Sequence, residues 1–156
     1  GALPDLAPAD VIAMWHVIEH VPDPGALLDA AVGALAPEGV LVVATPNPAS
    51  LQFRLLGARW VHLDAPRHLA LIPAPALIAR ACASGAVLDE LVDDDRPARD
   101  WNASGWQHAL RPGTETPVSP LVAKAGSAIA LGLSPAERRA GRATAYTAVF
   151  RNTRAR

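Results

Sequence analysis

The sequence predicts a mixed α/β fold with parallel strands, and two observations support this prediction. The segments 11–15 and 40–45 are apolar runs of strand length without polar alternation, which is the pattern of parallel strands buried on both faces. The residues between them have the spacing of an amphipathic helix. A strand, a helix and a second strand in this order form a right-handed unit with parallel strands. We therefore expect an open sheet with helices on both sides.

The first helix has clear boundary signals. Asp23 can cap its first turn, and Pro24 suits the first helical position. Its apolar residues recur at intervals of one turn: Leu27, Leu28, Ala31, Val32 and Leu35. Pro37 and Gly39 are expected to end this helix before the second strand.

The later elements are predicted in the same way. The loop 46–48 follows the second strand, and a short helix is expected around residues 50–56. A longer helix over 74–84 is closed by Gly85 and leads into a third strand over 86–92. Helical segments are expected within 96–140, and residues 143–151 have the composition of a last strand.

The composition restricts the class of protein. With 156 residues and a net charge of −1, the chain suits one domain and shows no general attraction to nucleic acid or to an anionic membrane. We therefore expect a small-molecule ligand, no nucleic-acid partner and no membrane. Cys82 is the single cysteine, so an intrachain disulfide is impossible, and a cytoplasmic location fits best.

The segment Asp10 to Pro24 carries the main site signal, because an apolar strand ends there in two histidines and a glutamate. Open α/β proteins bind ligands outside the carboxyl ends of their strands. The letters His16-x-x-Glu19-His20 also match an inverted zinc-protease motif, which leaves a zinc-dependent hydrolase as an alternative. That motif requires a continuous helix, whereas here the cluster follows a strand and precedes two prolines.

Several motifs in the same order resemble the class I S-adenosylmethionine-dependent methyltransferases of the small-molecule type. These are the segment 10–24, the turn 36–39, the strand end Thr45-Pro-Asn47, Trp60, and the segment Asp-Ala-Pro-Arg-His over 64–68. The resemblance is clear over 10–92, and 143–151 is similar to the family's final antiparallel strand. It implies that residues 1–156 are a single partial methyltransferase domain, with 96–140 as a variable helical insertion. The fold expected is the C-terminal half of a Rossmann-like sheet, strands four to seven of seven.

The resemblance also implies a function, which is methyl transfer from S-adenosylmethionine to a small-molecule acceptor, with an oxygen atom as the nucleophile. The family's glycine-rich cofactor loop and its ribose-binding acid have no counterpart in this sequence. We therefore expect weak or absent cofactor binding by this chain alone, and activity only within a longer parent protein.

The resemblance assigns roles to particular residues. His20 is expected to act as the catalytic base, with Glu19 and His16 as further catalytic groups. Met14, Trp15 and His16 are expected to contact the cofactor. The acceptor is expected to lie against Asn47, Trp60, Arg67 and His68.

Two further interpretations stay open. Some quinone-pathway and small-RNA methyltransferases that this loop resembles hold a divalent metal with a glutamate and histidine cluster, but His16 stands where they carry a carboxylate. We therefore expect no resident metal. The chain could instead be a non-catalytic partner that completes another protein's sheet, and the strand 11–15 is expected to form an exposed apolar edge through which copies associate.

Overall fold

The computed structural model describes residues 8–93, 96–111, 117–137 and 141–153. Within these residues one four-stranded sheet has the order β1-β2-β4-β3. The strands are β1 (Ala9–Trp15), β2 (Leu35–Pro46), β3 (Ala86–Val92) and β4 (Ala145–Asn152). β1 and β2 are parallel, whereas β4 runs antiparallel to both of its neighbours. The predicted α/β class and the parallel first pair of strands are confirmed.

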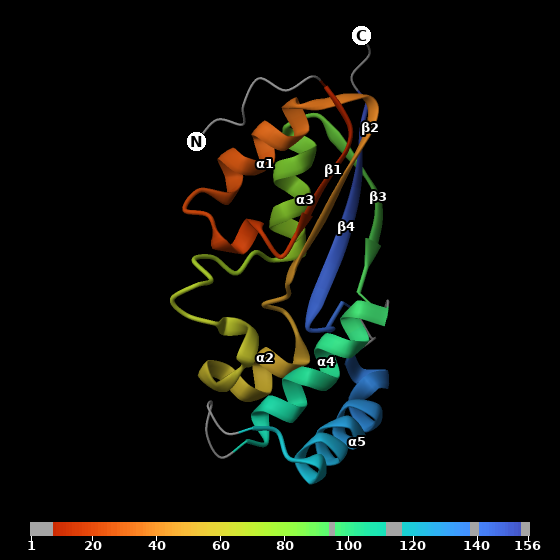
Figure 1. The fold of residues 1–156 in the computed structure, drawn as a ribbon. Coiled ribbons are helices and arrows are strands. Elements are labelled where there is room, and N and C mark those ends of the chain that lie inside the picture. Colours follow the sequence, from red (N-terminus) through yellow and green to blue (C-terminus); the bar gives the residue numbers. More distant parts are fainter. Residues whose placement is uncertain (1–7, 94–95, 112–116, 138–140, 154–156) are drawn as a thin grey trace.

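Two helices cover one face of the sheet. These are α1 (Pro24–Gly33) and α3 (Ala74–Ala83), which lie side by side in Figure 1. The core lies between them and the sheet, and it includes Leu28, Leu77 and Phe150. The remaining helices, α2 (Leu51–Leu56), α4 (Arg96–Ala109) and α5 (Pro120–Glu137), lie beyond the end of the sheet where β1 and β2 finish (Figure 1).

The local signals in the sequence act as expected. The Asp23 side chain accepts a hydrogen bond from the Ala26 N–H at 2.9 Å, and Pro24 is the first residue of α1. Ser50 caps α2 by accepting from the Phe53 N–H at 3.1 Å. Gly85 follows α3 with a positive φ of 96°, a conformation that glycine adopts without steric cost.

The boundary between α1 and β2 differs from the prediction. The helix ends at Gly33, and β2 already begins at Leu35, so Leu35 belongs to the strand. A side chain at Gly39 would lie 2.8 Å from the Ala36 carbonyl oxygen and 2.9 Å from that of Ala9. Gly39 therefore permits a close approach of two strands and does not mark the end of the helix.

The opposite face of the sheet corrects a second expectation, because the described helices α1 and α3 cover one side only. Val11 is 63% exposed, Trp15 is 49% exposed and Val87 is 49% exposed. The pairing register places Val11, Val40, Arg151 and Val87 in one row across the sheet. β1 forms an edge of the sheet, as expected. An apolar strand tends to be buried, but its sequence does not specify which segments pack on it.

Two helices, α4 and α5, occupy most of the described residues of the segment 96–140, for which helices were expected. Trp106 of α4 donates from Nε1 to the buried Glu137 carboxylate of α5 at 2.9 Å, which ties the two helices together. Residues 112–116 and 138–140 lie outside the described part of the chain. Among the helices described, none has the length and apolar character needed to cross a membrane.

Candidate functional site

The chain turns sharply where β1 ends. His16 has a φ of 52°, in the left-handed region that non-glycine residues seldom adopt. A single 3-10 turn, Ile18–His20, follows it. The turn buries the Glu19 side chain completely and leaves His20 exposed. Two adjacent residues are thereby given opposite environments.

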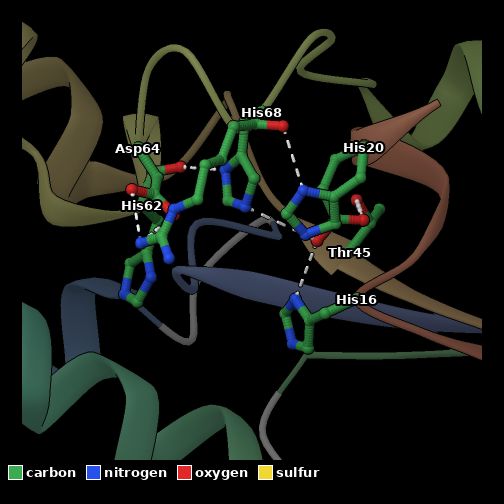
Figure 2. A network of polar contacts seen from close by, with 8 residues as sticks. His16, His20, Thr45, His62, Asp64 and His68 are labelled. Carbon is green, nitrogen blue, oxygen red and sulfur yellow. Dashed lines mark hydrogen bonds and ion pairs between the residues drawn. The ribbon is translucent and has the colours of Figure 1, made fainter. Parts of the chain in front are cut away.

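Glu19 is held by hydrogen bonds from two elements (Figure 2). His16 Nδ1 lies 3.0 Å from Oε1, and Thr45 near the end of β2 donates from Oγ1 to Oε2 at 3.2 Å. Burial raises the pKa of Glu19, but the hydrogen bonds from His16 and the backbone, with the nearby imidazoles of His16 and His68, outweigh it. The net pKa of Glu19 is below its ordinary value, so the group is a carboxylate at neutral pH.

The loop after α2 brings further histidines to this position. The Leu69 N–H donates to the Glu19 carbonyl at 2.8 Å, which fixes the loop against the turn. His20 Nδ1 lies 3.0 Å from the Arg67 carbonyl oxygen, and His68 Nδ1 lies 2.8 Å from that of His62. Because a carbonyl oxygen only accepts, each Nδ1 carries the proton, and Nε2 is left as the reactive nitrogen of the neutral ring.

These contacts create a compact polar cluster of Glu19, His20 and His68. One ligand atom from each side chain lies within 4.8 Å of the others, and the two imidazole rings are 4.7 Å apart. His68 Nε2 is 4.0 Å from Glu19 Oε1. The cluster can accept a proton, position a hydroxyl group or bind a cation.

The zinc-protease interpretation is wrong. β1 ends at Trp15, and the following helical turn spans only Ile18–His20, so His16 and His20 do not share the face of one helix. His16 bonds to Glu19, whereas His20 lies against His68. The spacing in the sequence matches that motif, but the backbone does not have the conformation it needs.

The residues expected to contact the cofactor are separated by the structure. Met14 is 5% exposed and belongs to the core between the sheet and the helices α1 and α3. Trp15 presents a half-exposed indole at the end of β1, and His16 packs beside it. These two residues line a cavity of about 10 Å³ together with Trp101.

The residues expected to contact the acceptor also fall into different places. Asn47 donates to two backbone carbonyls and accepts from the Ala49 N–H, so its amide holds a loop together. Trp60 is 1% exposed and packs on Phe53. The Arg67 side chain is exposed and pairs with Asp64 at 2.8 Å. Of the four, only His68 enters the cluster.

Three residues at this site were missed from the sequence. Thr45 holds Glu19, and Trp101 of α4 stacks on His16 with ring centroids 4.5 Å apart. His62 is buried beside Trp101, with centroids 4.7 Å apart, and burial lowers the pKa of His62 to about 4. The position of Thr45 at a strand end was a usable signal. No local sequence signal predicts the contact of Trp101 with His16, because His16 lies 85 positions earlier in the chain.

Comparison with known proteins identifies the family. A family model described as "Methyltransferase domain" matches residues 2–91, which is more than half of the chain. The chain belongs to this methyltransferase family. Its α/β fold is that of the class I methyltransferases, as the resemblance implied.

Comparison with individual relatives shows what share of their length this chain covers. Over 54 residues the chain is 46% identical to the "Ubiquinone biosynthesis O-methyltransferase" of Psychrobacter cryohalolentis, covering 33% of this chain and 21% of that protein. The structure is similar to the [4+2]-cyclase SpnF, with a TM-score of 0.56, 19% identity, and coverage of 97% of this chain and 52% of SpnF. It is also similar to the mycolic acid cyclopropane synthase CmaA1 complexed with SAH and CTAB, with a TM-score of 0.56, 17% identity, and coverage of 96% and 57%. The chain therefore spans little more than half the length of these solved structures.

Proposed function

We propose that this chain supplies the acceptor side of an S-adenosylmethionine-dependent methyltransferase that acts on an oxygen nucleophile of a small molecule. The cluster of Glu19, His20 and His68 at the carboxyl end of β1 is the observation that carries the proposal. The family match and the printed name of the Psychrobacter relative support methylation of oxygen.

His20 is the proposed catalytic base. Its Nδ1–H is held by the Arg67 carbonyl, so Nε2 is the atom that receives the proton of the acceptor hydroxyl. The buried Glu19 carboxylate has an oxygen within 4.8 Å of a His20 ring nitrogen and would stabilise the positive charge that then develops on the imidazole. His16 acts by holding Glu19 in place.

The described residues form only part of a binding site for S-adenosylmethionine. When bound, S-adenosylmethionine supplies a methyl group that is already activated for transfer. The exposed indole of Trp15 suits one wall of its cleft, but the cavity beside it, about 10 Å³, is far too small to enclose such a molecule. We propose that the rest of the cleft comes from segments that the solved relatives have and this chain lacks, so that the chain alone binds the cofactor weakly or not at all.

A metal-assisted form of the reaction is a second candidate, since the cluster also fits a divalent cation. Both histidines have Nδ1 fixed by a backbone carbonyl, the arrangement that orients metal-binding imidazoles. Two imidazoles and one carboxylate suit Zn²⁺ or Mn²⁺ better than Mg²⁺, which prefers oxygen ligands. A bound cation would polarise the acceptor oxygen, and Glu19, His20 and His68 would hold it.

The function is tested by transfer of radiolabelled methyl groups to a panel of small phenols, using the complete gene product. The His20→Ala variant is expected to lose about a hundredfold or more in turnover. Cys82→Ala, at an exposed position of α3, is the control and is expected to retain full activity. Undiminished turnover in His20→Ala would remove the proposed base. A complete gene product that binds no cofactor would favour a non-catalytic partner that completes another protein's sheet.

The two forms of the mechanism are separated by chelation. If His20 acts as a base, treatment with EDTA leaves turnover unchanged, because proton transfer to its Nε2 needs no cation. If a cation is held, EDTA abolishes turnover and added Zn²⁺ or Mn²⁺ restores it.

We also propose that isolated copies of the chain associate through β1. Among the described residues this strand is an edge of the sheet, and it exposes the apolar side chains of Val11 and Trp15 beside the charged Asp10. Light scattering is expected to show association that depends on concentration, reduced in Val11→Lys. A wild-type chain that stays monomeric at every concentration would contradict this proposal.

A further inference from the structure

The indole of Trp101 connects α4 to the residues that support the polar cluster. It stacks on the His16 imidazole, with ring centroids 4.5 Å apart and an angle of 23° between the planes. It also packs on the buried His62, with centroids 4.7 Å apart. The side chain is 37% exposed and does not belong to the core between the sheet and the helices. Its contacts with the two imidazoles therefore need an explanation other than core packing.

The residue after Trp101 fixes the position of this turn of α4. The Asn102 side-chain oxygen accepts from the Thr144 N–H at 2.8 Å, immediately before β4. The Asn102 carbonyl accepts from Nε2 of Gln52 in α2 at 2.7 Å. Asn102 is buried, so both hydrogen bonds are shielded from competing water. α4 is thus attached to β4 and to α2 at the turn that places the indole against His16.

The His16 ring has to lie in one orientation to hold Glu19. Its Nδ1 lies 3.0 Å from Glu19 Oε1, whereas rotation about the last torsion of a histidine side chain meets only low barriers. A stacked indole limits this rotation, because turning the imidazole out of the parallel plane loses the contact between the ring faces. The hydrogen bond to Glu19 then selects which of the two flipped forms in that plane is present.

The orientation of His16 matters for the group that it holds. The second carboxylate oxygen of Glu19 accepts from Thr45, and a Glu19 oxygen lies within 4.8 Å of ring nitrogens of His20 and His68. If the His16 ring turned away, the carboxylate could rotate about the remaining bond to Thr45. The negative charge would then no longer have a fixed place beside His20.

We propose that Trp101 is a positioning residue for methyl transfer, and that its indole holds His16 in the orientation that fixes Glu19 beside His20. This role rests on the proposed function, whereas the stacking of the two rings does not. Trp101 acts through His16 and supplies no reacting group. The segment 96–109 would then contribute to the rate as well as to the fold.

Kinetic measurements on the complete gene product test the role. Trp101→Leu keeps an apolar side chain without a ring and is expected to lower kcat about tenfold, with KM changed by no more than about twofold. Trp101→Phe keeps a ring that can stack and is expected to retain at least about half of the wild-type kcat. Leu110→Ala is the control, because Leu110 is 41% exposed just after α4 and is expected to keep the wild-type rate.

Three results of these measurements would overturn the proposal. Wild-type kcat in Trp101→Leu would show that the indole does not affect the reaction. Equal losses in Trp101→Leu and Trp101→Phe would show that ring stacking is not the cause. A raised KM with unchanged kcat would assign Trp101 to binding of the acceptor.

A double-mutant cycle tests whether Trp101 acts through His16. If it does, the variant that combines His16→Ala with Trp101→Leu is expected to have a kcat within about twofold of His16→Ala alone. If the combined variant loses a further factor equal to that of Trp101→Leu, the two residues act independently and the proposal is wrong.

Nitrogen chemical shifts of the His16 ring give a readout without methyl transfer, in the complete gene product without cofactor. The wild type and Trp101→Phe are expected to show one form with the proton on Nδ1, whereas in Trp101→Leu the shifts of the two ring nitrogens move toward each other as tautomers mix. Wild-type shifts in Trp101→Leu would show that the indole does not orient the imidazole. Undiminished turnover in His20→Ala would instead contradict the proposed function, so the two failures are distinguishable.

Discussion

The two halves of the polar cluster at the end of β1 are built in opposite ways. The inner half, Glu19 with His16 and Thr45, is anchored by side-chain hydrogen bonds, and Glu19 and Thr45 are completely buried. The outer half, His20 and His68, is anchored by backbone carbonyls and keeps one ring nitrogen of each residue available. The proposed function assigns the shape of the site to the inner half and the chemistry to the outer half. Substitutions should therefore affect stability in the inner half and activity in the outer half.

The largest effect on stability is expected from Glu19→Ala. The substitution leaves the buried Thr45 hydroxyl and the partly buried His16 imidazole without their acceptor, which costs roughly 3 kcal/mol in the free energy of unfolding. Chemical denaturation measures the loss, and Glu90→Ala at an exposed position of β3 is the control. If the two variants lose equal stability, Glu19 does not anchor the site.

The second expected effect is a pH dependence that originates at His62. Burial holds the pKa of His62 at about 4 in the folded chain, below its ordinary value of 6.5. Between these two values the unfolded chain binds the additional proton, so stability is complete above pH 6.5 and falls as pH decreases toward 4, by roughly 3 kcal/mol. Denaturation curves at several pH values are expected to show this slope. His62→Phe, which does not titrate, is expected to reduce it, and an unchanged slope would assign the effect to other groups.

A smaller loss is expected from Thr45→Val, which keeps the volume of the side chain and removes the donor to Glu19. The expected cost is about 1 kcal/mol, the usual net value of one hydrogen bond. Thr147→Val, half-buried on the neighbouring strand β4, is the control because it makes the same change of side chain without breaking the bond to Glu19. A cost in Thr45→Val no greater than in Thr147→Val would mean that the bond to Glu19 adds no stability.

The smallest effect on stability is expected from His20→Ala, although the same variant is expected to cause the largest loss of activity. His20 is exposed, so its removal should change the free energy of unfolding by about 0.5 kcal/mol or less. Thermal unfolding of wild type and variant measures this directly. A loss as large as that of Glu19→Ala would remove the distinction between the two halves.

The sequence alone predicted much of the fold, because the signals are local. The bounds of β3 at 86–92 and the start of α1 at Pro24 follow from apolar periodicity, a capping Asp23 and the terminating Gly85. The end of α1 was misplaced because Gly39 serves a contact between strands, and such a contact leaves no local signal. The number of covered sheet faces was also misjudged, since an apolar strand does not specify what packs on it.

The fold class, the family resemblance and the residue types at the end of β1 can all be inferred from the sequence. The burial of Glu19, the contact between His20 and His68, and the role of Asn47 in holding a loop are visible only in the folded chain. The same is true of the stacking of Trp101 on His16. The physical reason is that backbone propensities act between neighbours in the chain. Proton positions, burial and pKa values depend instead on groups that are distant in sequence and are brought together by packing.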